Sequence, residues 1–273
     1  MNQMRPDLGR RASMSIGSAR VGATVGLPSG GFHTSGQASG GTPSLRPVRG
    51  LLFDPGDVLY DATLWRRWLL QLLSRLGLRT NYRSFFYLWD HEYLADVYRG
   101  KRDFHQAMKS FLLAAGLSHG QIDEVEMACK GRRCQDEAAA RPLAGTKATL
   151  RTVRASGTIL GVLGNYDHPA AELAGHLDHL GLGGLFDAVV SSFDLGTTLP
   201  DPACYHAALA AMRLPPEQVA FVGHDSEELA GAAQVGMQTI AFNFDPEAQA
   251  DVYLVRFDEL LDLASAASRA AAG

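Results

Sequence analysis

Residues 50–61 read Gly-Leu-Leu-Phe-Asp-Pro-Gly-Asp-Val-Leu-Tyr-Asp. The short apolar run Leu51–Phe53 ends on Asp54, and the next two residues are Pro55 and Gly56. Proline cannot donate a hydrogen bond to a central strand, and glycine is common in turns, so the strand is predicted to stop there. Open α/β sheets bind their ligands beyond the carboxyl ends of parallel strands. The segment therefore predicts a buried strand that delivers Asp54 to a functional site.

From Leu143 onward, short apolar runs alternate with helical patterns. This alternation predicts an α/β fold, a doubly wound Rossmann-like parallel sheet with helices on both faces. Right-handed crossovers place the loops after the strands on one rim of the sheet. The predicted strands are 158–163, 188–190, 219–222 and 238–242, and the predicted helices are 168–180, 202–212 and 227–235. The residues expected to converge on the rim are Asp54, Asn165, Leu199 and His224.

The segment between the first two strands has the apolar spacing of helices rather than of strands. Four helices are predicted, near 62–73, 82–98, 104–115 and 122–133, as an inserted four-helix cap domain over residues 61–139. Residues 49–60 and 140–273 then form the α/β core, and the Gly/Ser/Arg-rich residues 1–48 are predicted to be a disordered tail. We expect one aromatic cluster to be the core of the insertion, and it comprises Tyr82, Phe85, Phe86, Tyr87 and Trp89.

Charge is distributed unevenly along the 273 residues. Residues 1–50 carry six arginines and one acidic residue, whereas the other 223 residues carry 19 basic and 28 acidic side chains, a net charge of −9. Such an acidic body argues against nucleic-acid binding, which needs clustered Lys and Arg. Three cysteines and the lack of a long apolar run predict a cytoplasmic protein that does not span a membrane.

Four stretches together resemble the motifs of the haloacid dehalogenase-like (HAD) hydrolase superfamily, over about residues 49–257. The first is the segment around Asp54, although the Asp-Gly pair of the family stands here in the order Gly56-Asp57. The second is Gly161–Asn165, where the family has Ser or Thr before Asn. The third runs from Leu185 to Pro202, and the fourth covers Val219–Asp225.

The resemblance implies a role for each matching position. Asp54 occupies the position of the nucleophile, which forms a covalent intermediate in the phosphatases of the family. Gly56 replaces the acid/base Asp, so Asp57 is the candidate to take over proton transfer. Gly164 replaces the Ser/Thr of the phosphate cradle, in which the backbone of Asn165 remains.

Two further positions differ from the family and affect charge and metal binding. Leu199 replaces the phosphate-binding Lys. His224 replaces a metal-binding Asp, and imidazole suits softer metals than Mg²⁺, which prefers oxygen ligands. The alternatives are a Mg²⁺ site, a site for Mn²⁺ or Zn²⁺, or no metal at all. The candidate metal ligands are Asp54, His224, Asp225 and Glu228.

Three functions follow from this pattern. The first is phosphatase-type hydrolysis of a small phosphorylated metabolite through Asp54, impaired because four of the five tested family positions are replaced. The second is a non-catalytic binding or regulatory relative, that is, a pseudoenzyme. The third is a metal-independent hydrolase of the dehalogenase type, which tolerates Gly56 but lacks the Lys and the hydroxyl that this branch also uses.

Overall fold

The computed structural model describes residues 46–62, 64–139 and 141–263, and the predicted tail lies outside the described residues except for its last three positions. The boundary of the core starts earlier than predicted. The backbone N–H of Arg46 donates to the side chain of Gln238 over 2.6 Å, and the Gln238 amide donates back to the Arg46 carbonyl over 3.1 Å. Val48 packs against the core as well. Residues 46–48 therefore belong to the folded part of the chain.

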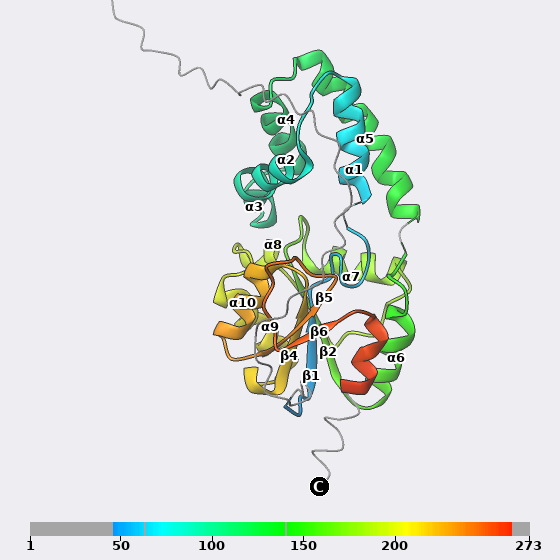
Figure 1. Ribbon diagram of the computed structural model, residues 1–273, viewed down its shortest axis with the longest axis vertical. Helices are drawn as coiled ribbons and strands as arrows, with labels where there is room; N and C mark the ends of the chain where they lie inside the picture. Colours follow the sequence, from blue (N-terminus) through cyan, green and yellow to red (C-terminus); the bar gives the residue numbers. More distant parts are fainter. Residues whose placement is uncertain (1–45, 63, 140, 264–273) are drawn as a thin grey trace, which may run out of the picture. The chain divides into compact units, whose positions relative to one another are not determined.

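A six-stranded parallel sheet forms the centre of the α/β part (Figure 1), in the order β3-β2-β1-β4-β5-β6. The apolar runs predicted the first five strands within one residue at each end. The sixth strand was not predicted. The strands are β1 Gly50–Phe53, β2 Ile159–Gly164, β3 Ala188–Ser191, β4 Val219–Gly223, β5 Gln238–Phe242 and β6 Val252–Leu254.

Helices cover both faces of this sheet, as the doubly wound prediction requires. Side chains alternate along β1, so Leu51 and Phe53 pack in one apolar cluster with α6 and α7, while Leu52 packs in a second with α9 and α10. Figure 1 shows α6 on one side of the sheet and α9 and α10 on the other. The helices are α6 Thr146–Ala155, α7 Ala170–His179, α8 Ser192–Leu195, α9 Pro202–Met212 and α10 Ser226–Gln234, with 3₁₀ turns at Pro216–Gln218 and Phe257–Glu259.

The strand order changes direction beside β1. Gly50–Phe53 pairs with β2 on one side and with β4 on the other, and the chain moves outward from this centre in both directions. Such a reversal leaves a crevice at the carboxyl ends of the two central strands, where open α/β folds bind ligands. The end of β1 is therefore the position in this fold at which a site is expected.

The chain between β1 and α6 is helical, with a hydrophobic core of its own. Its helices are α1 Leu64–Arg75, α2 Tyr82–Leu88, α3 Ala95–Tyr98, α4 Phe104–Ala114 and α5 His119–Ala139, and a π-helical segment, Trp89–Leu94, joins α2 to α3. Of the predicted aromatic cluster, Phe85, Phe86 and Trp89 are buried in this core, whereas Tyr82 and Tyr87 are 41% and 65% exposed. The cluster is thus only partly the core that the sequence predicted.

Candidate active site

Asp54 lies directly after β1, at the point where the strand order reverses. Its backbone N–H donates to the carbonyl of Val222 in β4 over 3.0 Å. This hydrogen bond continues the strand pairing by one residue and fixes the position of the Asp54 backbone. The residue is only 6% exposed. Burying a carboxylate is costly unless hydrogen bonds or an opposite charge compensate for it, so its partners define the site.

The partner of Asp54 is His224, which follows β4 directly. Its Nδ1 lies 2.8 Å from Oδ2 of Asp54. Burial lowers the pKa of His224, but the hydrogen bond to Asp54 and the negative charge of that carboxylate raise it, and the net result is a pKa of about 10. At neutral pH the side chain is therefore an imidazolium, and Nδ1 donates to the Asp54 carboxylate.

A second network joins the loops after β2 and β3 to α10. The side-chain oxygen of Asn165 accepts from the Leu199 N–H over 2.9 Å, and its amide nitrogen donates to Oε1 of Glu228 over 3.1 Å. Glu228 is buried, and this burial, together with the charge of Asp54, raises its pKa well above the usual value. Its other oxygen, Oε2, has no hydrogen-bond partner among the described residues. The side chain of Asn165 thus has a structural role at this junction.

Gly164 lies at the end of β2 and packs against the turn that follows Asp54. A Cβ atom at position 164 would lie 2.6 Å from Cδ of Pro55 and 3.7 Å from Oδ1 of Asp54. The first distance is far shorter than van der Waals contact. The ring of Pro55 therefore occupies the space that a serine or threonine side chain would need, which explains in steric terms why this position is glycine.

Asp57 is held in a left-handed turn, with φ of 55°. Its Oδ1 accepts from the Ala62 N–H over 2.9 Å, and its carbonyl accepts from the side chain of Asn243 over 2.9 Å. Burial raises the pKa of Asp57, and the neighbouring imidazolium of His224 lowers it. Asp57 is thus a partly buried carboxyl group with an increased tendency to hold a proton.

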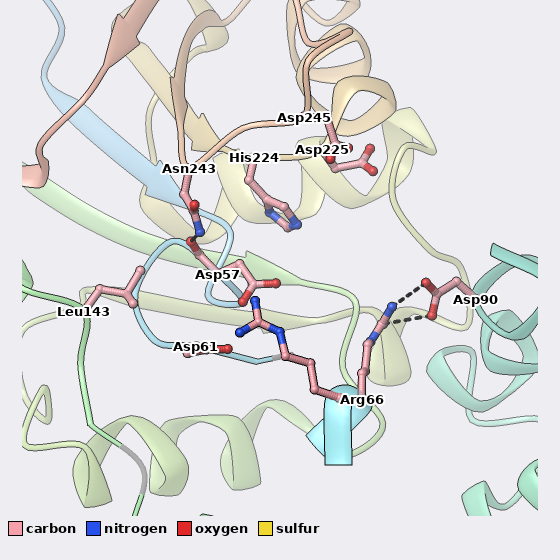
Figure 2. Close-up of a pocket in the computed structure, with 10 residues that line it drawn as sticks. Asp57, Asp61, Arg66, Asp90, Leu143, His224, Asp225, Asn243 and Asp245 are labelled. Carbon is pink, nitrogen blue, oxygen red and sulfur yellow. Dashed lines mark hydrogen bonds and ion pairs between the residues drawn. The ribbon is translucent and has the colours of Figure 1, made fainter. Parts of the chain in front are cut away.

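A cavity of about 530 Å³ adjoins these residues, and Asp57 and His224 both point into it (Figure 2). Asp54 is not among its lining residues, whereas the predicted site residues Asp57, His224 and Asp225 are. The cavity is lined by Asp57, Asp61, Arg66, Arg67, Asp90, Leu143, His224, Asp225, Asn243 and Asp245.

Both arginines of the cavity come from α1. Arg66 forms a bidentate ion pair with Asp90, with distances of 2.8 and 2.9 Å (Figure 2). Its guanidinium carbon also lies 4.9 Å from the ring centre of Phe86. Its charge is therefore already paired. Arg67 has no hydrogen-bond or ion-pair partner within the described part of the chain.

Of the cavity residues, the sequence predicted Asp57, His224 and Asp225 as site residues and missed the others, among them Asn243 and Asp245. Asn243 directly follows β5, so the rule that ligands bind beyond strand ends was the signal that could have identified it. Burial and the neighbouring Asp225 raise the pKa of Asp245. The lining is richer in carboxylates than in cationic groups.

Two of the four residues predicted as metal ligands, His224 and Asp225, fit Mg²⁺ poorly. His224 offers nitrogen rather than oxygen, and its Nδ1 already engages Asp54. The Asp225 carboxylate caps α10 by accepting from the N–H groups of Glu227 and Glu228 over 2.8 and 3.0 Å. Across residues 46–62, 64–139 and 141–263, no three His, Cys, Asp or Glu side chains are grouped so as to hold a metal ion.

The fold and this site define an α/β protein with a buried carboxylate at the reversal of its strand order. The family model for haloacid dehalogenase-like hydrolases matches residues 48–236. The chain belongs to this family of hydrolases, as the four motifs predicted.

Individual relatives match shorter parts of the chain. A glyceraldehyde 3-phosphate phosphatase from Methanothermobacter thermautotrophicus is 33% identical over 41% of this chain and 49% of its own. The (S)-2-haloacid dehalogenase 4A of Burkholderia cepacia is 31% identical over 35% of this chain and 40% of its own. The chain thus spans less than half the length of these relatives. A solved structure described as a predicted phosphoglycolate phosphatase from Haemophilus somnus 129PT has a TM-score of 0.60 at 18% identity, covering 81% of this chain and 99% of that one, which shows a shared fold.

The sequence predicts that the protein does not span a membrane. None of the helices among the described residues combines the length and apolar character of a membrane-spanning segment. The predicted cytoplasmic location remains a prediction.

Proposed function

We propose that this protein is a hydrolase that acts through Asp54 on a small phosphorylated metabolite, with a turnover reduced by its replaced partners. The observation that carries the proposal is the position of Asp54, buried at the reversal of the strand order with one oxygen held by His224 at 2.8 Å. The other oxygen, Oδ1, accepts no hydrogen bond from a described residue and is the atom assigned to attack. The partial match to a phosphatase supports the same chemistry.

The proposed reaction has two steps. Oδ1 of Asp54 attacks phosphorus, the bond from phosphorus to the leaving oxygen breaks, and Asp57 gives that oxygen a proton. Water, deprotonated by Asp57, then attacks the aspartyl phosphate, which releases inorganic phosphate and restores the Asp54 carboxylate. Asp57 is assigned to proton transfer because it lines the cavity and because burial raises its pKa.

The turnover is expected to be slow. A phosphoryl group must approach a cavity lined by several carboxylates, and the site has a buried leucine at position 199 and a glycine at position 164 where the family has a cationic group and a hydroxyl. Loss of one stabilising group at an active site commonly costs roughly 10²- to 10³-fold in turnover. With two such losses we expect a turnover at least about 10⁴-fold below an ordinary value of about 10 s⁻¹.

We further propose that the helices α1–α5 act as a cap that contributes to substrate choice. Arg66, Arg67 and Asp90 from these helices line the same cavity as Asp57 and His224. Arg67 is the cationic side chain assigned to meet the negatively charged part of the substrate, because Arg66 is paired with Asp90.

One assay tests the proposal. The purified protein is offered p-nitrophenyl phosphate, a panel of phosphorylated metabolites and a 2-haloalkanoate, with Asp54→Asn and the surface control Asp258→Asn measured in parallel. We expect slow phosphate release that disappears in Asp54→Asn and persists in Asp258→Asn. Halide release alone would identify the metal-independent dehalogenase-type chemistry instead. Equal rates in the wild type and in Asp54→Asn would exclude Asp54 as the nucleophile.

A specific observation favours the second candidate, a non-catalytic binding or regulatory relative. Asp54 is not among the residues that line the cavity, whereas His224 and Asp57 are. In that case the cavity binds a ligand that is never hydrolysed. Beryllium fluoride, which mimics an aspartyl phosphate, would then fail to raise the melting temperature, whereas a hydrolase of the proposed kind should gain thermal stability from it.

A further inference from the structure

His224 lies beside Asp54 at the carboxyl ends of the two central strands. It follows β4, the strand next to β1, and its ring reaches across to Asp54, the residue at the corresponding end of β1. The resemblance to the family places a metal-binding carboxylate at position 224. Here an N–H donor reaches Oδ2 of Asp54 directly over 2.8 Å, which is a full hydrogen bond and leaves no room for an ion between the two side chains.

The neighbouring carboxylates are each engaged through one oxygen, Oδ1 of Asp225 and Oε1 of Glu228. The Asp225 carboxylate accepts two backbone N–H groups at the start of α10. Glu228 accepts the amide of Asn165 through Oε1, and its Oε2 is buried without a partner. A divalent cation beside Asp54 would have to displace the ring of His224, whose Nδ1 engages Oδ2 of Asp54.

We propose that the Nδ1–H group of His224 replaces the metal ion of this site, so that Asp54 is positioned by a side chain and the protein is indifferent to divalent cations. The hydrogen bond from His224 holds Oδ2 of Asp54. Oδ1 of Asp54 lies on the side of Gly164, where a Cβ atom at position 164 would be 3.7 Å from it. His224 is therefore a positioning residue for Asp54. The proposal relies on the proposed function only for its catalytic use, since indifference to cations is a property of the folded protein itself.

The substitution His224→Asp tests the inference, because it restores a hard oxygen ligand beside Asp54 and Glu228. The melting temperature is measured in EDTA and in MgCl₂ for the wild type, for His224→Asp and for His206→Asp, which makes the same change at an exposed position on α9. At about 10 mM Mg²⁺ and a site of millimolar affinity, we expect His224→Asp to gain about 3 °C or more, and the other two proteins to change by less than about 1 °C. The proposal would be overturned if Mg²⁺ raised the melting temperature of the wild type as much as that of His224→Asp. It would also be overturned if Mg²⁺ did not raise the melting temperature of His224→Asp.

A second measurement keeps the inference testable if His224→Asp does not fold. The wild type is titrated with Mn²⁺ and the free ion is followed by electron paramagnetic resonance, beside Asp54→Asn. No binding that depends on Asp54 is expected, and such binding would overturn the proposal. The rates of phosphate release in EDTA and in MgCl₂ separate the two proposals. If phosphate release requires the metal, the proposed role of His224 is refuted, and Asp54 can still be the nucleophile. If there is no turnover at all, the proposed function is refuted, and the thermal test of His224 remains valid.

Discussion

The charge of His224 is predicted to depend on Asp54, and removing that carboxylate should change both its titration and the stability of the protein. The substitution Asp54→Asn keeps the shape and still offers an oxygen to Nδ1, but it removes the negative charge. Burial lowers the pKa of His224, and in the variant this effect is no longer offset by a negative charge at position 54. We expect the pKa of the ring to fall from about 10 in the wild type to near or below the ordinary value of about 6.5.

The magnitude follows from the difference between the folded and unfolded states. A rise from 6.5 to about 10 corresponds to roughly 5 kcal/mol. The His224 side chain is 28% exposed, so water screens part of the interaction and we expect about 2 to 4 kcal/mol. Because the folded pKa is the higher one, this stabilisation is complete below about pH 6.5 and is lost as the pH rises through about 10. Over that range, it should decrease by up to about 1.4 kcal/mol per pH unit.

Two measurements check this prediction. The ring of His224 is followed by heteronuclear NMR as the pH is changed, and urea unfolding is measured at intervals between pH 6 and pH 10 for both proteins. The difference in unfolding free energy between the wild type and Asp54→Asn should be largest at the acidic end and should shrink toward pH 10. A His224 ring that titrates near 6.5 in the wild type, or a difference that does not vary with pH, would refute the reasoning.

Two further substitutions test the packing of the site. Gly164→Ser should lower the free energy of unfolding by about 1 to 3 kcal/mol, because its Cβ would lie 2.6 Å from the Pro55 ring, whereas Gly175→Ser on α7, with no atom within 4 Å, should leave urea unfolding nearly unchanged. Arg66→Met should cost about 1 to 3 kcal/mol by leaving Asp90 half-buried without its partner. Adding Asp90→Asn should recover part of that loss in the same assay, and full additivity of the two changes would contradict the pairing.

Sequence reasoning found most of the sheet because buried parallel strands appear as continuous apolar runs. β5 and α9 were predicted with the bounds that the structure has, and α9 also carries an Asp cap followed by Pro at its first position. β6 was missed because it has three residues and its central Tyr253 is 48% exposed at the edge of the sheet. A short, half-exposed edge strand has too little pattern to be recognised.

The candidate site was predictable in position but not in detail. The rule that strand ends converge placed Asp54, Asn165, Leu199 and His224 together, and the contacts between them agree with it. The 2.8 Å contact of His224 with Asp54 depends on the side-chain rotamer, which no sequence pattern specifies. The approach of α1 to the cavity depends on how the helical segment packs, so the placing of its arginines could not be predicted either.

The close packing of Pro55 against Gly164 also constrains how this site can evolve. A hydroxyl-bearing side chain at position 164 fits without steric strain only where the pyrrolidine ring at position 55 has been replaced by something smaller or more flexible. The two positions are therefore epistatic, and the order of mutation matters: position 55 must change first for the intermediate protein to remain well folded. A hydroxyl at position 164 is therefore reached at the least cost in stability when position 55 changes first.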